Sequence, residues 1–158
     1  MPQLTSENRE KMLVSYPRKA WVSLGEAQAA IAQATNDPTK VLVASNRAYY
    51  AVYLAANAWM AYKGGYPNLA ERRNNWSHET VNEHWVTILD QIDKDAGVQA
   101  DYDGDTIYTK LKALRVRVDY SISSDPTIKD VTDAVDASQR ATGWLLKALK
   151  TVQKGNKR

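Results

Sequence analysis

Both histidines of the chain lie in one short polar stretch, RRNNWSHETVNEHW, which covers residues 72–85. Within it, Arg73 and Asn74 precede His78 by five and four residues. A histidine can transfer a proton near neutral pH and an arginine can stabilise a phosphorane, so such a pair could cleave RNA without a metal ion. Arg73, Asn74 and His78 are therefore candidate catalytic residues. The alternative, which we favour, is that Ser77 caps a helix and His78 only belongs to its first turn.

A second candidate group consists of Arg115, Asp119 and Tyr120. Arg115 and Asp119 are four residues apart and therefore share one face of a helix. As a ligand site, Arg115 would offer a planar set of donors to a phosphate while Asp119 holds the guanidinium in place. As a structural pair, Asp119 would satisfy Arg115 at the edge of a bundle with Tyr120 packed beside them, which the neighbouring apolar residues slightly favour. Arg47 is a further candidate for binding nucleic acid or a nucleotide.

The composition excludes several kinds of site. The chain has 158 residues, about the length of one domain, and contains no cysteine. It therefore has no disulfide, no thiolate metal ligand and no catalytic thiol. Two histidines without cysteines do not suit a zinc site, and the acidic run from Asp101 to Asp105 lacks the remaining ligands of a calcium loop. We expect neither a metal nor a cofactor, and interpret the acidic run as a loop that caps a helix.

The two termini bear on location and charge. The N-terminal residues lack the apolar core of a signal peptide, and no stretch is long and apolar enough for a membrane span. We therefore expect a cytoplasmic protein that does not enter membranes. The net charge is +3, and most of the surplus falls in the last twelve residues. We interpret residues 154–158 as a solubilising basic tail rather than a nucleic-acid contact.

Apolar residues repeat at steps of three and four along most of the chain, and this spacing predicts five helices. The first covers residues 18–35, the second runs from the Asp37-Pro38 cap to Gly64-Gly65, the third from Ser77 to near Gly97, the fourth covers residues 107–122 and the fifth 128–152. Residues 64–76 are rich in glycine and asparagine and should form an exposed loop. The expected fold is all-α, a single five-helix up-and-down bundle over residues 18–153 that follows an N-terminal extension of residues 1–17.

The second predicted helix should lie at the centre of this bundle. Its apolar stripe is nearly all alanine between residues 44 and 58, so a neighbouring backbone can approach it closely. Tyr49, Tyr50, Tyr53 and Trp59 flank the stripe and thicken it.

Three segments in this order resemble the HEPN superfamily of prokaryotic helical domains. They are SNRAYYAVYLAANAWMAYKG (45–64), SHETVNEHW (77–85) and LKALRVRVDY (111–120). The similarity is to small stand-alone members with a Tyr-Tyr-Ala second helix, a Thr/Ser-His start of the third helix and an Arg-x-x-Ala-Asp-Tyr signature on the fourth. Those positions are here Tyr49, Tyr50 and Ala51, then Ser77 and His78, then Arg115, Val118, Asp119 and Tyr120. The resemblance implies a HEPN-like bundle over about residues 18–153.

Active members of that superfamily are ribonucleases or toxins with an Arg-polar-x3-His motif, usually near the start of a late helix and paired across a dimer cleft. In this chain the motif string runs from Arg73 to His78, before the third predicted helix, and the fourth carries Asp119 and no histidine. The leading hypothesis is a HEPN-like module that binds RNA, a nucleotide or a protein partner without catalysis, in a toxin–antitoxin or phage-defence system.

Two alternatives stay open. One is a metal-independent endoribonuclease toxin that uses Arg73 and His78. The other is a structural adaptor whose tyrosines and tryptophans serve packing and dimerisation alone. The resemblance implies a homodimer in each case, and it suggests a nucleotidyltransferase-type or antitoxin protein as a partner.

Overall fold

The computed structural model describes residues 4–67, 69–70, 75–120 and 127–156. Over these residues the chain forms the five helices α1 (Ser6–Gln33), α2 (Lys40–Lys63), α3 (His78–Ala96), α4 (Gly104–Tyr120) and α5 (Ile128–Gly155), together with the two-residue strands β1 (Leu69–Ala70) and β2 (Asn75–Trp76). The all-α class and the five helices predicted from the spacing are confirmed. None of these helices, over the described residues, is long and apolar enough to cross a membrane.

Helix α2 lies at the centre of the molecule and contacts each of the other four helices. Its alanines at positions 44, 48, 51, 55 and 58 are at most 1% exposed. Because these side chains are small, the backbones of α1 and α5 can pack closely against it. Helix α5 lies so close to α2 that the hydroxyl of Ser138 donates a hydrogen bond to the carbonyl oxygen of Ala48 at 2.6 Å. The predicted central position of this helix is confirmed.

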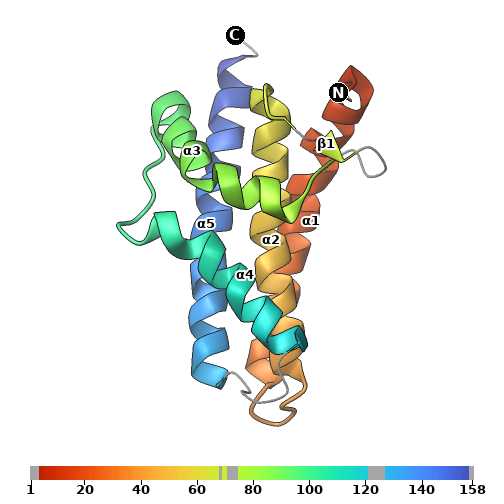
Figure 1. Cartoon of the computed structure of the whole chain (residues 1–158), viewed down its shortest axis with the longest axis vertical. Coiled ribbons are helices and arrows are strands. Elements are labelled where there is room, and N and C mark those ends of the chain that lie inside the picture. The colour runs from red at the N-terminus through yellow and green to blue at the C-terminus, as the bar shows by residue number, and fades with distance from the viewer. Residues whose placement is uncertain (1–3, 68, 71–74, 121–126, 157–158) are drawn as a thin grey trace.

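The three longest helices, α1, α2 and α5, lie alongside one another, and α3 and α4 cross them obliquely (Figure 1). Along the colour gradient, α1 runs opposite to α2, whereas α5 runs in the same direction as α2. The order is therefore not up-and-down throughout. Helices α3 and α4 have 19 and 17 residues against 28 in α1 and α5, so they cannot follow the full length of the bundle.

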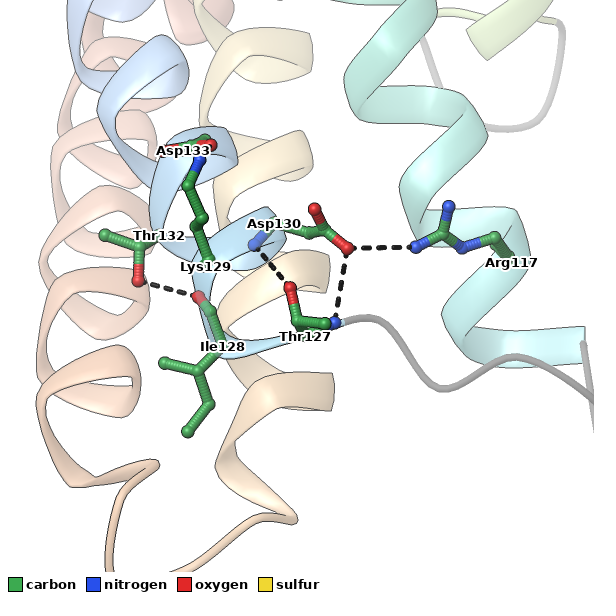
Figure 2. Close-up of polar contacts among 7 residues, drawn as sticks. All are labelled: Arg117, Thr127, Ile128, Lys129, Asp130, Thr132 and Asp133. Atoms are coloured by element: carbon green, nitrogen blue, oxygen red, sulfur yellow. Dashed lines mark hydrogen bonds and ion pairs between the residues drawn. The ribbon is translucent and has the colours of Figure 1, made fainter.

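Several helix ends lie where local sequence signals predict them. The Ser77 side chain accepts a hydrogen bond from the Thr80 amide at the start of α3, and Gly97 ends α3 in the left-handed conformation. Helix α5 begins with a capping box, in which Thr127 and Asp130 accept hydrogen bonds from each other's amides (Figure 2). The Ser123-Ser124-Asp125-Pro126 break predicted before it lies outside the described residues.

Helix α1 begins at Ser6, well before the predicted start at residue 18. Pro17 lies inside it, although a proline inside a helix removes one hydrogen bond of the ladder. Two contacts hold this N-terminal part against the bundle. Met12 is 3% exposed in the core, and Arg9 donates to the carbonyl oxygens of Ala61 and Tyr62 at the end of α2. Tertiary contacts therefore extend the helix through a proline that local propensity disfavours.

The exposed loop predicted between α2 and α3 is found at Gly64, Gly65 and Pro67, which are exposed, but Leu69 and Trp76 are buried. Strands β1 and β2 pair antiparallel, with Leu69 opposite Trp76, and these two side chains are 8% and 2% exposed. Asn57, buried in α2, accepts a hydrogen bond from the Trp76 amide at 2.8 Å, and Tyr53 donates to the Trp76 carbonyl at 2.6 Å. Trp76 is thus anchored to α2 directly before α3 begins, and this anchor determines where His78 lies.

Candidate functional site

Three tyrosines of α2 form an aromatic patch against which His78 packs. Tyr49 and Tyr53 are four residues apart, so they share one helical face, and Tyr50 lies beside them. The His78 ring lies 4.1 Å from the Tyr53 ring between centroids, and it meets the Tyr50 ring edge-on at 5.8 Å and 89°. Because Ser77 and Trp76 fix the start of α3, the imidazole is held over α2 from the first turn of its own helix.

A chain of hydrogen bonds leads from His78 into the core. The Tyr49 hydroxyl lies 2.7 Å from His78 Nδ1 and 2.9 Å from the Tyr108 hydroxyl of α4. Tyr49 and Tyr108 are fully buried, and the Tyr108 ring stacks on Trp85 at 5.3 Å. Burial raises the pKa of Tyr49 to about 12 and raises the pKa of Tyr108 as well. Both phenols therefore stay protonated at neutral pH, and Tyr49 holds the His78 ring through Nδ1.

Arg115 contacts the same aromatic patch from α4, a different helix from that of His78. The central carbon of its guanidinium lies over the Tyr49 ring at 5.3 Å and over the Tyr50 ring at 5.4 Å from the centroids. These distances are typical of cation–π contacts. The structure thus brings Arg115 and His78, which are 37 positions apart in the sequence, into contact with the same two tyrosines.

Asp119 pairs with Arg115, as their spacing predicts, but the pair is loosely arranged. Arg115 Nε lies 3.5 Å from an Asp119 carboxylate oxygen, and the two side chains are 23% and 31% exposed. The Nε atom is buried and makes no hydrogen bond to any residue that the structure describes. Asp119 therefore supplies charge without a directed hydrogen bond to Nε. The side chain of Tyr120, the third member of the predicted group, lies outside the described part of the structure.

The remaining residues singled out from the sequence make other contacts or lie outside the described residues. Arg47, on α2 one turn before Tyr50, forms an ion pair with Glu26 of α1 at 2.9 Å. Arg73 and Asn74 lie outside the described residues, so their pairing with His78 stays a prediction. His84, interpreted from the sequence as a packed or interfacial residue, is half-buried and lies edge-on to the Tyr66 ring at 5.2 Å.

From the sequence the tyrosines of α2 were interpreted as packing residues, and their place in the site was not predicted. Tyr49 and Tyr50 stood out as part of the Tyr-Tyr-Ala motif, and a Tyr-Tyr-x-x-Tyr spacing on one helix was a signal that Tyr53 belongs with them. Tyr108 gave no such signal. Its partner Tyr49 is 59 residues away, and only the crossing of α4 over α2 brings the hydroxyls together.

The assembled site combines an arginine, an imidazole and partly exposed aromatic rings. His78, Tyr50 and Arg115 are each intermediate in exposure, so a ligand can reach them without the core opening. These groups can bind a phosphate by charge and hydrogen bonds, stack on a planar base, or transfer a proton. In the described parts of the chain, no three histidine or carboxylate side chains gather in a way that could hold a metal ion.

Comparison with known proteins finds no match, whether among family models, curated protein sequences or solved structures. The HEPN resemblance accordingly rests on the motif residues alone.

Proposed function

We propose that the protein is a HEPN-like helical module that binds single-stranded RNA without cleaving it. The binding site would consist of Arg115, His78 and Tyr50, the last of which belongs to the aromatic patch. The observation that carries this proposal is the convergence of Arg115 and His78 on the ring of Tyr50 from two different helices. Proteins that bind single-stranded nucleic acids by charge and stacking combine cationic groups with exposed aromatic rings. An arginine beside a partly exposed aromatic ring is such a combination.

The position of Arg115 supports a role in phosphate binding. Contacts with two tyrosine rings restrict its guanidinium before any ligand arrives, which reduces the ordering cost of binding. The planar group presents donors that match phosphate oxygens in pairs. The contact of Arg115 with Asp119 at 3.5 Å includes no hydrogen bond to Nε, so a phosphate would compete with charge attraction alone at this atom.

The test is the affinity of the full chain for a fluorescently labelled oligouridine, measured by anisotropy. Arg115→Ala should weaken binding by about tenfold or more, the loss expected for a hydrogen bond to a charged group. Arg115→Lys should recover only part, because an ammonium lacks the planar fork. Arg117→Ala removes the same charge from the same helix, where Arg117 pairs with Asp130 at 3.5 Å, and should bind like the wild type.

Melting temperatures of the same samples separate binding from bracing. If Arg115 is only a structural brace of the bundle, Arg115→Ala should lower the melting temperature and leave RNA affinity unchanged. That result would contradict the binding proposal.

A second candidate function is a metal-independent ribonuclease, and the orientation of His78 favours it. The Tyr49 hydroxyl contacts Nδ1 and the Tyr53 ring packs on the imidazole, so the ring that would transfer a proton to a substrate is held in place. Arg115, or Arg73 as the sequence motif suggests, would stabilise the phosphorane. RNA degradation in EDTA tests this function: His78→Ala should abolish it and His84→Ala should not, whereas no degradation by the wild type would exclude it.

The resemblance also supports a homodimer and a role in a toxin–antitoxin or phage-defence system. A nucleotidyltransferase-type or antitoxin protein would then be the partner. A purely structural dimerising adaptor is the reading that remains if neither RNA binding nor cleavage is measured.

A further inference from the structure

A pocket lies in the groove between α1 and α2, where Tyr50 of the aromatic patch forms part of its lining. It encloses about 270 Å³. Three cationic residues line it, Arg18, Lys19 and Arg47, with a single carboxylate, Glu26. Tyr50 also lines it, so the pocket and the Arg115 patch share this one aromatic side chain. The pocket carries more positive than negative charge at a place where an anion can enter.

The charges within this α1–α2 pocket are only partly paired. Glu26 is engaged by Arg47, and both of these side chains are about half exposed at 47% and 48%. The Lys19 ammonium lies over the Tyr16 ring at 5.9 Å. Arg18 is exposed and has no hydrogen bond or ion pair with any residue of the described chain. A guanidinium without a carboxylate partner is available to an incoming phosphate.

The walls of the pocket are held in fixed relation to each other. Ser23 of α1 is 5% exposed, and its hydroxyl donates a hydrogen bond to the Arg47 carbonyl oxygen of α2 at 2.8 Å. This bond joins the two helices at the level of the cationic residues. Arg47 and Tyr50 are three residues apart on α2, which makes them neighbours on one helical face. The pocket is therefore continuous with the patch along a rigid helix.

We propose that the α1–α2 pocket binds a second phosphate of the same single-stranded RNA, adjacent to the phosphate held by Arg115, with a base stacked on Tyr50 between them. This inference rests on the proposed RNA-binding function and names its substrate class. The ligand is a polynucleotide with at least two consecutive phosphates, because a mononucleotide cannot occupy both cationic sites.

The first experiment measures the affinity of the full chain for labelled oligouridine over a series of salt concentrations. Arg18→Gln should weaken binding several-fold, and it should reduce the slope of log K against log salt by about 0.7, the value for one phosphate contact on a single strand. Lys150→Gln removes the same charge from an exposed position on α5 and should change neither quantity. Melting temperatures should be the same for all three proteins, since Arg18 and Lys150 are exposed.

The outcomes separate this inference from the function on which it rests. If Arg115→Ala weakens binding and Arg18→Gln behaves like Lys150→Gln, the pocket is not a phosphate site and the RNA-binding function stands. If the wild type binds no oligouridine, both are overturned. If Arg18→Gln alone weakens binding, the pocket is retained and Arg115 is excluded as its partner, which overturns the two-phosphate arrangement.

A second experiment compares ligands by displacement of the same oligouridine. The 5′-phosphorylated dinucleotide pUpU carries two phosphates and should compete at least tenfold better than uridine 5′-monophosphate. In the Arg18→Gln variant this preference should largely disappear, because one of the two phosphate sites has lost its cation. Equal competition by the two ligands in the wild type would overturn the proposal of a second phosphate.

Discussion

Two arginines of neighbouring helices differ in how many hydrogen bonds they make to carboxylates. Arg140 of α5 donates two hydrogen bonds of 3.0 Å to Asp103 and a third of 2.8 Å to Asp101. Arg115 of α4 meets one carboxylate at 3.5 Å without a hydrogen bond to its Nε atom, and it lies over two tyrosine rings. The guanidinium of Arg140 makes three hydrogen bonds to carboxylates, whereas that of Arg115 is positioned mainly by rings. A ligand phosphate would have to displace hydrogen-bonded carboxylates at Arg140, whereas at Arg115 it meets one carboxylate at 3.5 Å with no hydrogen bond to Nε.

Two grooves of the molecule differ in size as well as in charge. The groove between α4 and α5 encloses about 540 Å³, twice the volume of the α1–α2 pocket. Its charged lining is balanced, with three cations and three carboxylates, and Arg117 and Asp130 pair with each other (Figure 2) while Arg140 pairs with Asp103. A lining with balanced charges leaves little net field for a polyanion.

The largest expected effect is on the free energy of unfolding, when the hydrogen bonds that hold Tyr49 of the aromatic patch are removed. Tyr49→Phe keeps the ring but removes the hydroxyl that joins His78 to Tyr108, and it leaves the buried Tyr108 hydroxyl without this partner. We expect the free energy of unfolding to fall by about 1–3 kcal/mol, the cost of an unsatisfied buried group. Urea denaturation measures it. Tyr102→Phe makes the same change at a fully exposed position and should have no effect; equal stability of both variants would contradict the hydrogen-bond chain.

A smaller effect should distinguish the two arginines directly. Arg140→Ala removes a cation that binds two carboxylates on the surface, so we expect the melting temperature to fall by a few degrees and RNA affinity to stay unchanged. The charge-matched Arg115→Ala should show the larger loss of affinity. If Arg140→Ala weakened RNA binding as much as Arg115→Ala, the contrast between an arginine bonded to carboxylates and one positioned by rings would be wrong.

The smallest effect is a dependence on acid. Hydrogen bonds from Arg140 lower the pKa of the Asp103 carboxyl below its ordinary value. A carboxyl whose pKa is lower in the folded than in the unfolded protein adds stability above its unfolded pKa of about 4, and that stability is lost as the pH falls below this value. Melting between about pH 6 and pH 3 should therefore be less acid-sensitive in Asp103→Asn than in the wild type. Identical pH profiles would contradict this linkage.

Much of the fold could be predicted from the sequence because the signals are local. The alanine stripe of α2, the Ser77 cap and the left-handed Gly97 each depend on residues within a turn or two of one another. The acidic run predicted to cap a helix leads into the first turn of α4, which begins at Gly104, and the Gly104 amide donates to the Asp101 carbonyl oxygen there. Its carboxylates are also used by Arg140, which is 37 residues beyond Asp103 and has no local signal to reveal it.

The candidate site could be predicted only in its parts. His78 and Arg115 were identified from residue type and spacing, as was the Arg115–Asp119 pair. The sequence could not show that both residues meet on Tyr49 and Tyr50, since this depends on the oblique crossing of α3 and α4 over α2. For the same reason the exposed loop expected at residues 64–76 was wrong at Trp76, whose backbone is bound by Asn57 and Tyr53 of α2.

The sequence by itself determined the all-α class, the central helix and several helix ends, because periodicity and capping are properties of neighbouring residues. Tertiary structure decided where α1 begins, where β2 is anchored and which cations are neutralised. Each of these depends on hydrogen bonds or ring contacts between residues tens of positions apart, such as Arg9 with Ala61 and Tyr49 with Tyr108. Burial then determines their strength, because a polar contact stabilises most where water cannot replace it.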